Sequence, residues 1–496
     1  MNITTAFADV AASAGAKTAL FWGDREITYG ELREQSRAVA LRLRDGFGVR
    51  PGDRVGVWLK NCPEFVAVLF GVLEAGAVFV PINNFLKPAE VGFILGDAGV
   101  DVLVTEAELA PHFPALAELR PGLRLLRVED PAEPAGPGSD ADLPGTARLE
   151  GDLAVLIYTS GTTGRPKGAM LSHGNLLHNV ESCRLILQIV PFDRFVVMLP
   201  MFHSYMLTVG LLLPLLVGGS ILLIKSLHPV RNLLAEIISR KASILPAIPQ
   251  FYRSLVAAPG VVQFPLRLCV SGAAPLPVQI LKEFEAKFQI PLIEGYGLSE
   301  ASPVVTKNPL DGTRKPGSIG QPVPNVEVSI QDEEGNLLGP DEIGELCVRG
   351  GNVMLGYWNQ PDETARVMRH GWLLTGDIGR RDIEGFYYIT DRKKDMLLVN
   401  GINVYPREIE EILYQFPGVK EAAVIGKPDA RRGEQPVAFV SPADGVSLDE
   451  TTLLQFVREH LADYKTPRHV VFLPALPRNA TGKVLKTALR QMEIEE

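Results

Sequence analysis

A regular alternation of strand-like and helix-like segments is the feature that most limits the possible folds of this chain. Near the N-terminus, the short apolar runs DRVGVWL, VFVPI and VDVLVT predict strands. Before and between them, ELREQSRAVALRLRD and PEFVAVLFGVLEAG predict helices, the second of which begins at Pro63. Such alternation is typical of α/β folds, so we predict an α/β protein.

The length of the chain predicts more than one domain, because 496 residues exceed the size at which one hydrophobic core usually stops growing. A β-rich block ends near DRKKD (Asp391 to Asp395), and the helix predicted after it has an apolar face made of Ile409, Ile412, Leu413 and Phe416. We therefore predict a large N-terminal domain of α/β layers with a β-rich subdomain (residues 1–390) and a small α+β C-terminal domain (residues 391–496). The Pro- and Gly-rich segment from Glu129 to Ala147 is expected to be an exposed connection.

Composition and charge disfavour several classes of protein. A net charge of −9 argues against binding nucleic acid through its phosphates. The four cysteines are scattered, with no pair at a spacing suited to zinc. The N-terminus lacks the basic and apolar regions of a signal peptide. We expect a protein of the reducing cytoplasm.

The stretch from Phe195 to Ile224 contains no charged residue and is long enough to span a membrane. Two prolines, His203 and the pair Gly218-Gly219 interrupt it. The interruptions predict a loop, a helix at about Met206 to Val217 and a buried strand, SILLI. We favour a buried core; the alternatives are a spanning segment and peripheral contact with a membrane.

The segment YTSGTTGRPKGAM is predicted to bind an anion. Its glycines allow close approach of the backbone, and its hydroxyls and Lys167 supply donors without any carboxylate. The apolar run LAVLIY before it predicts a strand that carries the loop to a sheet edge. A Walker loop is excluded, because Pro166 replaces its second glycine and Gly168 follows the lysine. The alternative is a flexible surface loop.

Five motifs, in order, resemble the signatures of the adenylate-forming superfamily of acyl-CoA synthetases, nonribosomal adenylation domains and luciferases. They are YTSGTTGRPKGAMLSH, EGYGLSE (294–300), LLTGDIG (373–379), DRKKD with NGINVYPREIE, and PRNATGK (477–483). Each alone is weak, but their order over nearly the whole chain is specific, and the chain looks most like a bacterial fatty-acyl-CoA ligase. The resemblance implies that a carboxylate attacks the α-phosphorus of ATP, that pyrophosphate leaves, and that CoA then accepts the acyl group.

The resemblance also implies which residues bind ATP and Mg²⁺. Its phosphate ligands would be Thr159, Ser160, Gly161, Thr162, Thr163, Gly164 and Lys167. The adenine and α-phosphate would be bound by Gly272, Ala273, Glu294, Gly295, Tyr296, Gly297 and Ser299, and the ribose by Asp377 and Arg392. Mg²⁺ would be held by Glu300 and Thr159, because a hard cation prefers oxygen ligands. The alternative for Glu300 is a helix-capping carboxylate.

The resemblance implies that the C-terminal domain is mobile and that it takes part in two half-reactions. Lys483 would be the catalytic residue that reaches the carboxylate and the α-phosphate, and Asp391 would be the hinge. After rotation, the loop at Gly401 would line the thiol channel. Lys465 and Arg468 would contact the phosphates of CoA, or form an ordinary solvated surface. No carrier domain follows Lys483 in this sequence, so we expect no in-line assembly module, while a separate carrier protein stays an open acceptor.

The segment PMFHSYM predicts an apolar acyl pocket. It offers no carboxylate to the ammonium of an amino acid, which weakens that class of substrate. The expected lining is Met201, Phe202, Tyr205, Met206 and Ile248, with His203 as a catalytic gate or as an ordinary buried histidine. Burial of methylenes favours a medium- or long-chain fatty acid. Aryl- or cyclic-acid ligase, acyl-AMP ligase, luciferase-like oxygenase and nucleotide sensor are the alternatives.

Overall fold

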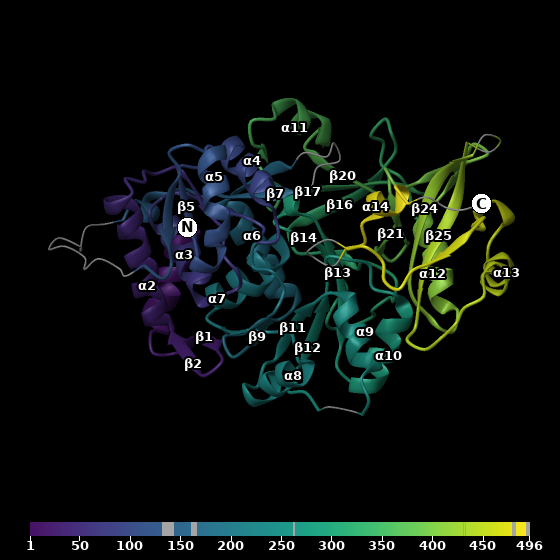
Figure 1. Ribbon diagram of the computed structural model, residues 1–496, viewed down its shortest axis with the longest axis horizontal. Helices are drawn as coiled ribbons and strands as arrows, with labels where there is room; N and C mark the ends of the chain where they lie inside the picture. Colours follow the sequence, from purple (N-terminus) through teal and green to yellow (C-terminus); the bar gives the residue numbers. More distant parts are fainter. Residues whose placement is uncertain are drawn as a thin grey trace.

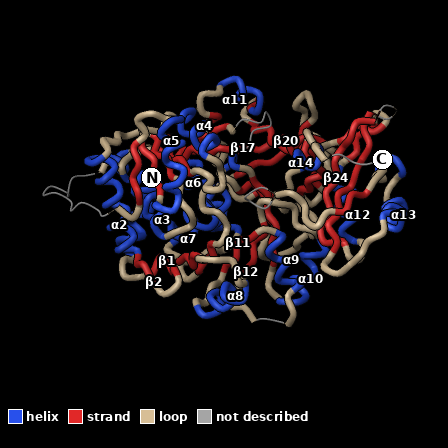
Figure 2. The backbone as a smooth tube through the Cα atoms, viewed as in Figure 1, coloured by secondary structure: helices blue, strands red, loops and turns tan. Residues whose placement is uncertain are grey.

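The computed structural model describes residues 1–130, 143–159, 166–260, 263–429, 431, 433–478 and 483–492. Figure 1 shows a large N-terminal unit and a smaller C-terminal unit that contains the last long strands and helices. Both units mix helices and strands (Figure 2). The predicted α/β fold class with a large and a small domain is confirmed.

Two large sheets form the framework of the N-terminal unit. In spatial order, the nine-stranded sheet contains β15 (Gln321–Pro322), β14 (Val304–Lys307), β13 (Leu292–Gly297), β12 (Leu268–Ser271), β11 (Ile244–Ala247), β9 (Arg194–Val197), β10 (Ser220–Leu223), β1 (Thr18–Trp22) and β2 (Arg25–Thr28). The seven-stranded sheet contains β18 (Gly356–Tyr357), β8 (Lys167–Ser172), β7 (Leu153–Thr159), β4 (Val78–Pro81), β3 (Arg54–Val57), β5 (Val102–Thr105) and β6 (Arg124–Arg127). Their inner strands are parallel and apolar on both faces, as strands between helical layers require.

Three helical layers enclose these sheets. The layer between the sheets contains α1 (Ile3–Ser13), α2 (Tyr29–Leu41), α3 (Pro63–Glu74), α6 (His173–Ile186), the π-helix η4 (Met206–Leu212) and α7 (Leu213–Val217). The outer face of the seven-stranded sheet packs against α4 (Pro88–Ala98), η2 (Ala107–His112) and α5 (Phe113–Leu119). The outer face of the nine-stranded sheet packs against α8 (Val230–Ser239), α9 (Pro249–Ala257) and α10 (Val278–Phe288). Three single turns complete this unit: η1 (Arg42–Gly46), η3 (Pro144–Ala147) and η5 (Ser299–Ala301).

The charge-free stretch lies in the middle of this arrangement. It forms β9, η4, α7 and β10, and Phe195, Leu211 and Ile221 are fully buried. The prediction of a buried core is therefore confirmed. Among the residues that the structure describes, no helix is both long and apolar enough to cross a membrane.

The predicted exposed connection from Glu129 to Ala147 is only partly described, since residues 131–142 lie outside the described residues. Glu129, Thr146 and Ala147 are exposed, as predicted, but Leu143 and Gly145 are not. Leu143 and Gly145 are buried, and a Cβ at Gly145 would lie 2.3 Å from the carbonyl oxygen of Leu73. The segment therefore ends against α3, because only a glycine allows the backbone to approach so closely.

A β-rich block leads into the C-terminal unit. It contains β16 (Val326–Gln331), β17 (Gly344–Gly350), β20 (Trp372–Arg381), β19 (Met368–Arg369) and β21 (Tyr387–Arg392), with α11 (Pro361–Val367) between β18 and β19. The C-terminal sheet contains β23 (Ile402–Val404), β22 (Leu397–Val399), β25 (Gly433–Pro442), β24 (Val419–Asp429) and, beside β25, β26 (Val470–Phe472). Its helical turns are α12 (Pro406–Gln415), α13 (Glu450–His460), η6 (Asp463–Lys465) and α14 (Lys486–Arg490).

The helices α12 and α13 cover one face of the C-terminal sheet, and α14 contributes Leu489 to the core on the other. On α12, Ile409 and Leu413 are fully buried, and Ile412 and Phe416 pack at their edge, which confirms the predicted apolar face. The division at residues 390 and 391 falls inside β21, two residues before this strand ends, and stays a prediction.

Candidate active site

The two residues predicted to bind ribose lie opposite each other on neighbouring strands. The antiparallel register of β20 and β21 pairs Asp377 with Arg392. Arg392 Nε lies 3.0 Å from Asp377 Oδ1, and the hydroxyl of Tyr296 donates to Asp377 Oδ2 at 2.5 Å. The Asp377 carboxylate is buried, while Arg392 is partly exposed. The predicted ribose and adenine residues are therefore brought together in one hydrogen-bonded group.

The predicted phosphate loop joins two antiparallel strands, since β7 pairs with β8 and Thr159 lies opposite Lys167. Ser160, Gly161, Thr162, Thr163 and Gly164 lie outside the described residues. Lys167 is buried, its ammonium donates to a carboxylate oxygen of Glu363 on α11, and it also lies 5.4 Å from the ring centre of Tyr357. This structure therefore holds the lysine of the motif in an ion pair that the sequence did not predict.

Glu300 lies on η5 and faces the same group of residues. The hydroxyl of Tyr357 donates to Glu300 Oε1 at 2.9 Å, and the neighbouring hydroxyls of Ser299 and Ser204 are 2.8 Å apart. The Glu300 side chain is only partly buried, so its second oxygen suits a hydrated Mg²⁺ that also binds substrate phosphates. The donor set of one carboxylate and the Thr159 hydroxyl fits such an ion.

The small residues predicted to form the adenine wall lie at the ends of two neighbouring parallel strands, β12 and β13. Gly272 and Ala273 follow β12, and Ala273 has a φ of +65°. A Cβ at Gly297 would lie 2.0 Å from the carbonyl oxygen of Pro303, so this turn accepts only glycine. These contacts explain why small residues stand in both motifs.

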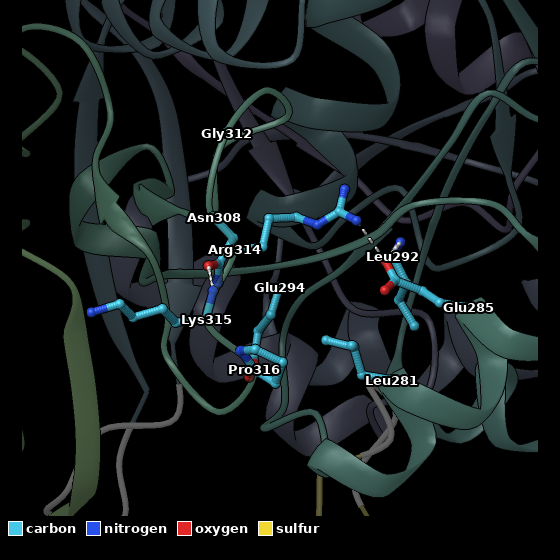
Figure 3. Close-up of a pocket in the computed structure, with 9 residues that line it drawn as sticks. All are labelled: Leu281, Glu285, Leu292, Glu294, Asn308, Gly312, Arg314, Lys315 and Pro316. Carbon is cyan, nitrogen blue, oxygen red and sulfur yellow. Dashed lines mark hydrogen bonds and ion pairs between the residues drawn. The ribbon is translucent and has the colours of Figure 1, made fainter.

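Glu294 points away from this wall. Figure 3 shows it with Leu281 and Glu285 of α10, lining a cavity of about 200 Å³ on the outer side of the nine-stranded sheet. Its Oε1 accepts a hydrogen bond from the amide of Leu276 at 2.9 Å, and burial raises the pKa of this carboxyl to about 7. The predicted contact of Glu294 with adenine would therefore involve its backbone.

The predicted acyl pocket is a nearly closed cavity of about 10 Å³. Its lining consists of Leu199, Pro200, His203, Tyr205, Met206, Ile248 and Ala273. Met201 and Phe202 are buried beside it; Met201 N donates to Asn61 Oδ1 at 2.9 Å, and the Phe202 ring meets Phe85 edge-on. Three of the five predicted lining residues thus line the cavity, whereas Met201 and Phe202 do not.

His203 lies at this cavity and is neutral at pH 7. Burial, and then the positive charge of Lys483, lowers the pKa of His203 to about 4. Its Nδ1 accepts a hydrogen bond from the amide of Tyr205 at 3.2 Å, so the imidazole proton is assigned to Nε2.

The last predicted catalytic residue, Lys483, reaches this site from the C-terminal unit. Burial, and then Arg392, lowers the pKa of Lys483 to about 8, while Asp377 acts in the opposite direction. The Lys483 ammonium is near enough to His203, Arg392 and Asp377 to interact electrostatically with all three. The arrangement is suited to binding a carboxylate beside an α-phosphate.

The predicted hinge residue joins β21 to the C-terminal unit. Asp391 is buried, and its carboxylate accepts hydrogen bonds from the amides of Arg392 and Arg407, at 2.7 and 2.9 Å. A second contact between the units is the Arg253 guanidinium, 5.1 Å from the ring centre of Tyr414.

The residues predicted to bind CoA lie within the C-terminal unit. Gly401 has a φ of +78° in the turn between β22 and β23, a conformation that favours glycine. Lys465 Nζ lies 2.7 Å from both carboxylate oxygens of Glu408, so its charge is already paired. Arg468 is exposed, and its amide donates to Pro436 O. Their contact with CoA stays a prediction.

Comparisons with known proteins decide the family. A family model described as AMP-binding enzyme matches residues 7–358, and a model described as AMP-binding enzyme C-terminal domain matches residues 408–483. The chain belongs to the AMP-binding enzyme family. This AMP-binding enzyme is 38% identical to a long-chain-fatty-acid–CoA ligase from Bacillus subtilis, over 98% of the chain and 94% of that protein. It is also 38% identical to a feruloyl-CoA synthase from Amycolatopsis, over 96% of the chain and 95% of that protein.

Solved structures agree with this family and allow the conformation of the chain to be compared with ATP-bound and apo forms of one protein. ATP-bound MatB from Rhodopseudomonas palustris matches this enzyme with a TM-score of 0.91 at 33% identity, covering 99% of both chains. Apo MatB, with the same coverage, matches with a TM-score of 0.79. The arrangement described above is therefore more similar to the ATP-bound form. The predicted membership of the adenylate-forming superfamily is confirmed.

Three residues at the site were missed by sequence reasoning. Tyr357 and Glu363 contact Glu300 and Lys167, and Lys307 is fully buried on β14. The signals were weak: a GYWN turn, a glutamate in a short helix, and one lysine at the end of the apolar run VVTK.

Removing the Tyr357 hydroxyl should slow the enzyme, because a hydrogen bond to a charged group contributes about 1.5–3 kcal/mol. We expect Tyr357→Phe to lower kcat/KM for MgATP on the order of tenfold, measured as pyrophosphate release. Tyr388→Phe is the matched control, since its hydroxyl also donates to a carboxylate, Asp382, at 3.1 Å. Equal losses in the two variants would contradict a specific role for Tyr357.

Proposed function

We propose that the chain is an AMP-forming ligase that joins a medium- or long-chain fatty acid to CoA. One observation carries the proposal: Lys483 of the C-terminal unit is near enough to His203, which lines the apolar cavity, and to the Asp377–Arg392 pair to interact with them electrostatically. The named relatives support it, because one is a long-chain-fatty-acid–CoA ligase and the other a feruloyl-CoA synthase. The 38% identity to a feruloyl-CoA synthase supports an aryl carboxylate as the second candidate.

In the first half-reaction, this chain positions two anions that repel each other. Asp377 and Tyr296 hold the nucleoside, while the Lys483 ammonium lies between the α-phosphate and the substrate carboxylate. A carboxylate oxygen then attacks the α-phosphorus, and the bond to pyrophosphate breaks. Lys167 would bind the leaving phosphates once it exchanges Glu363 for them. His203 is neutral, so it can close the cavity without binding a second anion.

Mg²⁺, when bound by Glu300 and Thr159, would neutralise charge on the phosphates. Tyr357 orients the Glu300 carboxylate for this role.

In the second half-reaction, the thiol of CoA attacks the acyl carbon and AMP leaves with the oxygen that joined it to the acyl group. Lys483 occupies that side of the site in the present arrangement, so the C-terminal unit would rotate about Asp391 to admit the thiol. The turn at Gly401 would then face the acyl group. Lys465 would have to exchange Glu408 for a phosphate of CoA.

The free cysteines support a cytoplasmic location.

The product formed from ATP tests the proposal. We expect AMP and pyrophosphate in a one-to-one ratio, dependent on Mg²⁺ and on a fatty acid, because attack at the α-phosphorus is the step that this site can align. Nucleotides separated by chromatography give the answer. ADP as the stoichiometric product would contradict the proposed reaction.

A further inference from the structure

Glu363, in the first turn of α11, is a carboxylate with two cationic partners. One of its oxygens accepts a hydrogen bond from the Lys167 ammonium, and the other accepts one from the Arg366 guanidinium. The Lys167 side chain is 8% exposed, that of Glu363 is 21% exposed and that of Arg366 is 71% exposed. The carboxylate can therefore leave the buried ammonium and still keep a partner at the surface.

The position of α11 is fixed by contacts with the backbone around this ion pair. The amide of Tyr357 donates to Thr364 Oγ1 at 2.8 Å, and the amide of Trp358 donates to the carbonyl oxygen of Gly168 at 2.8 Å. Gly168 and Thr364 are the immediate neighbours of the two paired residues in the chain. The ion pair is thus built into the junction of β8, β18 and α11.

The same pair lies beside the residue that contacts Glu300. The Lys167 ammonium is 5.4 Å from the ring centre of Tyr357, and the hydroxyl of Tyr357 donates to Glu300 Oε1 at 2.9 Å. Lys167 and Glu300 are the residues expected to meet the phosphates of ATP and their Mg²⁺. A phosphate that approaches the ammonium is repelled by the carboxylate of Glu363 and competes with it for the same charge.

We propose that Glu363 is the displaceable counter-ion of Lys167, and that it sets the balance between binding of the β- and γ-phosphates of ATP and release of pyrophosphate. In the free enzyme it neutralises a buried ammonium that would otherwise be uncompensated. The phosphates replace it when ATP binds, and Arg366 retains it. When it recovers Lys167 after adenylation, pyrophosphate loses that partner. The inference rests on the proposed function and adds to it a residue that acts through Lys167, not on the reacting atoms.

The experiment measures binding by calorimetry with three ligands: inorganic pyrophosphate with Mg²⁺, ATP with Mg²⁺ but without acid or CoA, and AMP. We expect Glu363→Gln to bind pyrophosphate and ATP at least about tenfold more tightly than the parent, because neither has to displace a carboxylate. Its affinity for AMP should equal that of the parent, since AMP lacks the β- and γ-phosphates. Asp362→Asn is the matched control: it removes an exposed carboxylate from the same turn and should change none of the three affinities.

Two further variants test whether Glu363 acts through its partners. In a Lys167→Met background, Glu363→Gln should tighten neither pyrophosphate nor ATP. Arg366→Met changes an exposed side chain, so it tests the proposal even if Glu363→Gln does not fold; by removing the second partner of Glu363, it should weaken pyrophosphate binding about threefold. In steady state, Glu363→Gln should have a lower KM for ATP and stronger inhibition by pyrophosphate, without a rise in kcat.

Four results would overturn the inference while leaving the proposed function standing. They are pyrophosphate binding to Glu363→Gln that is no tighter than to the parent, AMP binding that tightens as much as pyrophosphate binding, a gain that persists in the Lys167→Met background, and pyrophosphate binding to Arg366→Met that is not weakened. Absence of AMP formation by the parent with every acid would overturn the proposed function and this inference together.

Discussion

Replacing Lys483 with alanine is expected to slow acyl-adenylate formation at least ~100-fold, as the loss of one preorganised charged donor does in other active sites. The physical reason lies in the charge of the ammonium, which is near enough to His203, Arg392 and Asp377 to interact with them electrostatically. Thioester formation from supplied acyl adenylate and CoA should stay near the parental rate, because the rotated C-terminal unit would carry Lys483 away. Single-turnover rates of both half-reactions measure the difference.

The control for this prediction is Lys420→Ala, which removes an exposed lysine of the same unit that pairs with Asp444. It should leave both rates unchanged. Equal losses of the two half-reactions in Lys483→Ala, with the fold intact by circular dichroism, would contradict domain rotation and leave the ligase assignment standing.

The pH dependence of the adenylation rate is an independent test of the role of the Lys483 charge. The pKa of Lys483 is lowered to about 8, chiefly by burial, so its charged form is lost as the pH rises through that value. The adenylation rate of the parent enzyme should fall above about pH 8. Lys483→Ala should lack this fall, because it has no group left to deprotonate.

The length of the acyl chain should have the second large effect on kcat/KM. Each buried methylene contributes ~0.8 kcal/mol, so eight additional carbons can contribute up to ~6 kcal/mol, or roughly 10⁴-fold in kcat/KM. The cavity walls are apolar at Leu199, Met206 and Ile248, and among the described residues that line them no side chain is charged at pH 7. We expect acids of roughly eight to sixteen carbons to exceed acetate by at least ~100-fold.

A matched pair of variants assigns this preference to the cavity. Ile248→Asp places a charge on the lining and should lower the advantage of the long acids over acetate. Ile238→Asp, at an exposed position on α8, should not. Highest kcat/KM with acetate would contradict an apolar acyl site, and highest kcat/KM with benzoate would favour the aryl alternative.

Several residues predicted to bind the nucleotide do lie together in the structure, and the sequence could indicate them because they belong to short, ordered motifs. The pairing of Asp377 with Arg392 was predicted from two separate motifs, and the strand register explains it, since the residues are directly opposite. The buried core over the charge-free stretch was also predicted, because prolines and glycines divide that stretch into elements too short to span a membrane.

Other features depend on tertiary contacts that no local pattern reports. The ion pair of Lys167 with Glu363 joins β8 to α11, which are separated by almost two hundred residues. The hydrogen bond from Tyr357 to Glu300 likewise joins two elements that are distant in the sequence, β18 and η5. Lys307 follows three apolar or small residues, so its charge is compatible with a strand end at the surface. Only the packing of α6 against β14 shows that it is buried.

The most direct test of the proposed chemistry follows an oxygen atom. Incubation with ATP, CoA and a fatty acid whose carboxylate oxygens are both ¹⁸O should give AMP that contains one ¹⁸O and a thioester that contains the other, because the carboxylate oxygen that attacks the α-phosphorus leaves with AMP. Mass spectrometry of AMP and of the acyl-CoA measures both. AMP without ¹⁸O would show that no acyl adenylate forms, and would contradict the proposed reaction.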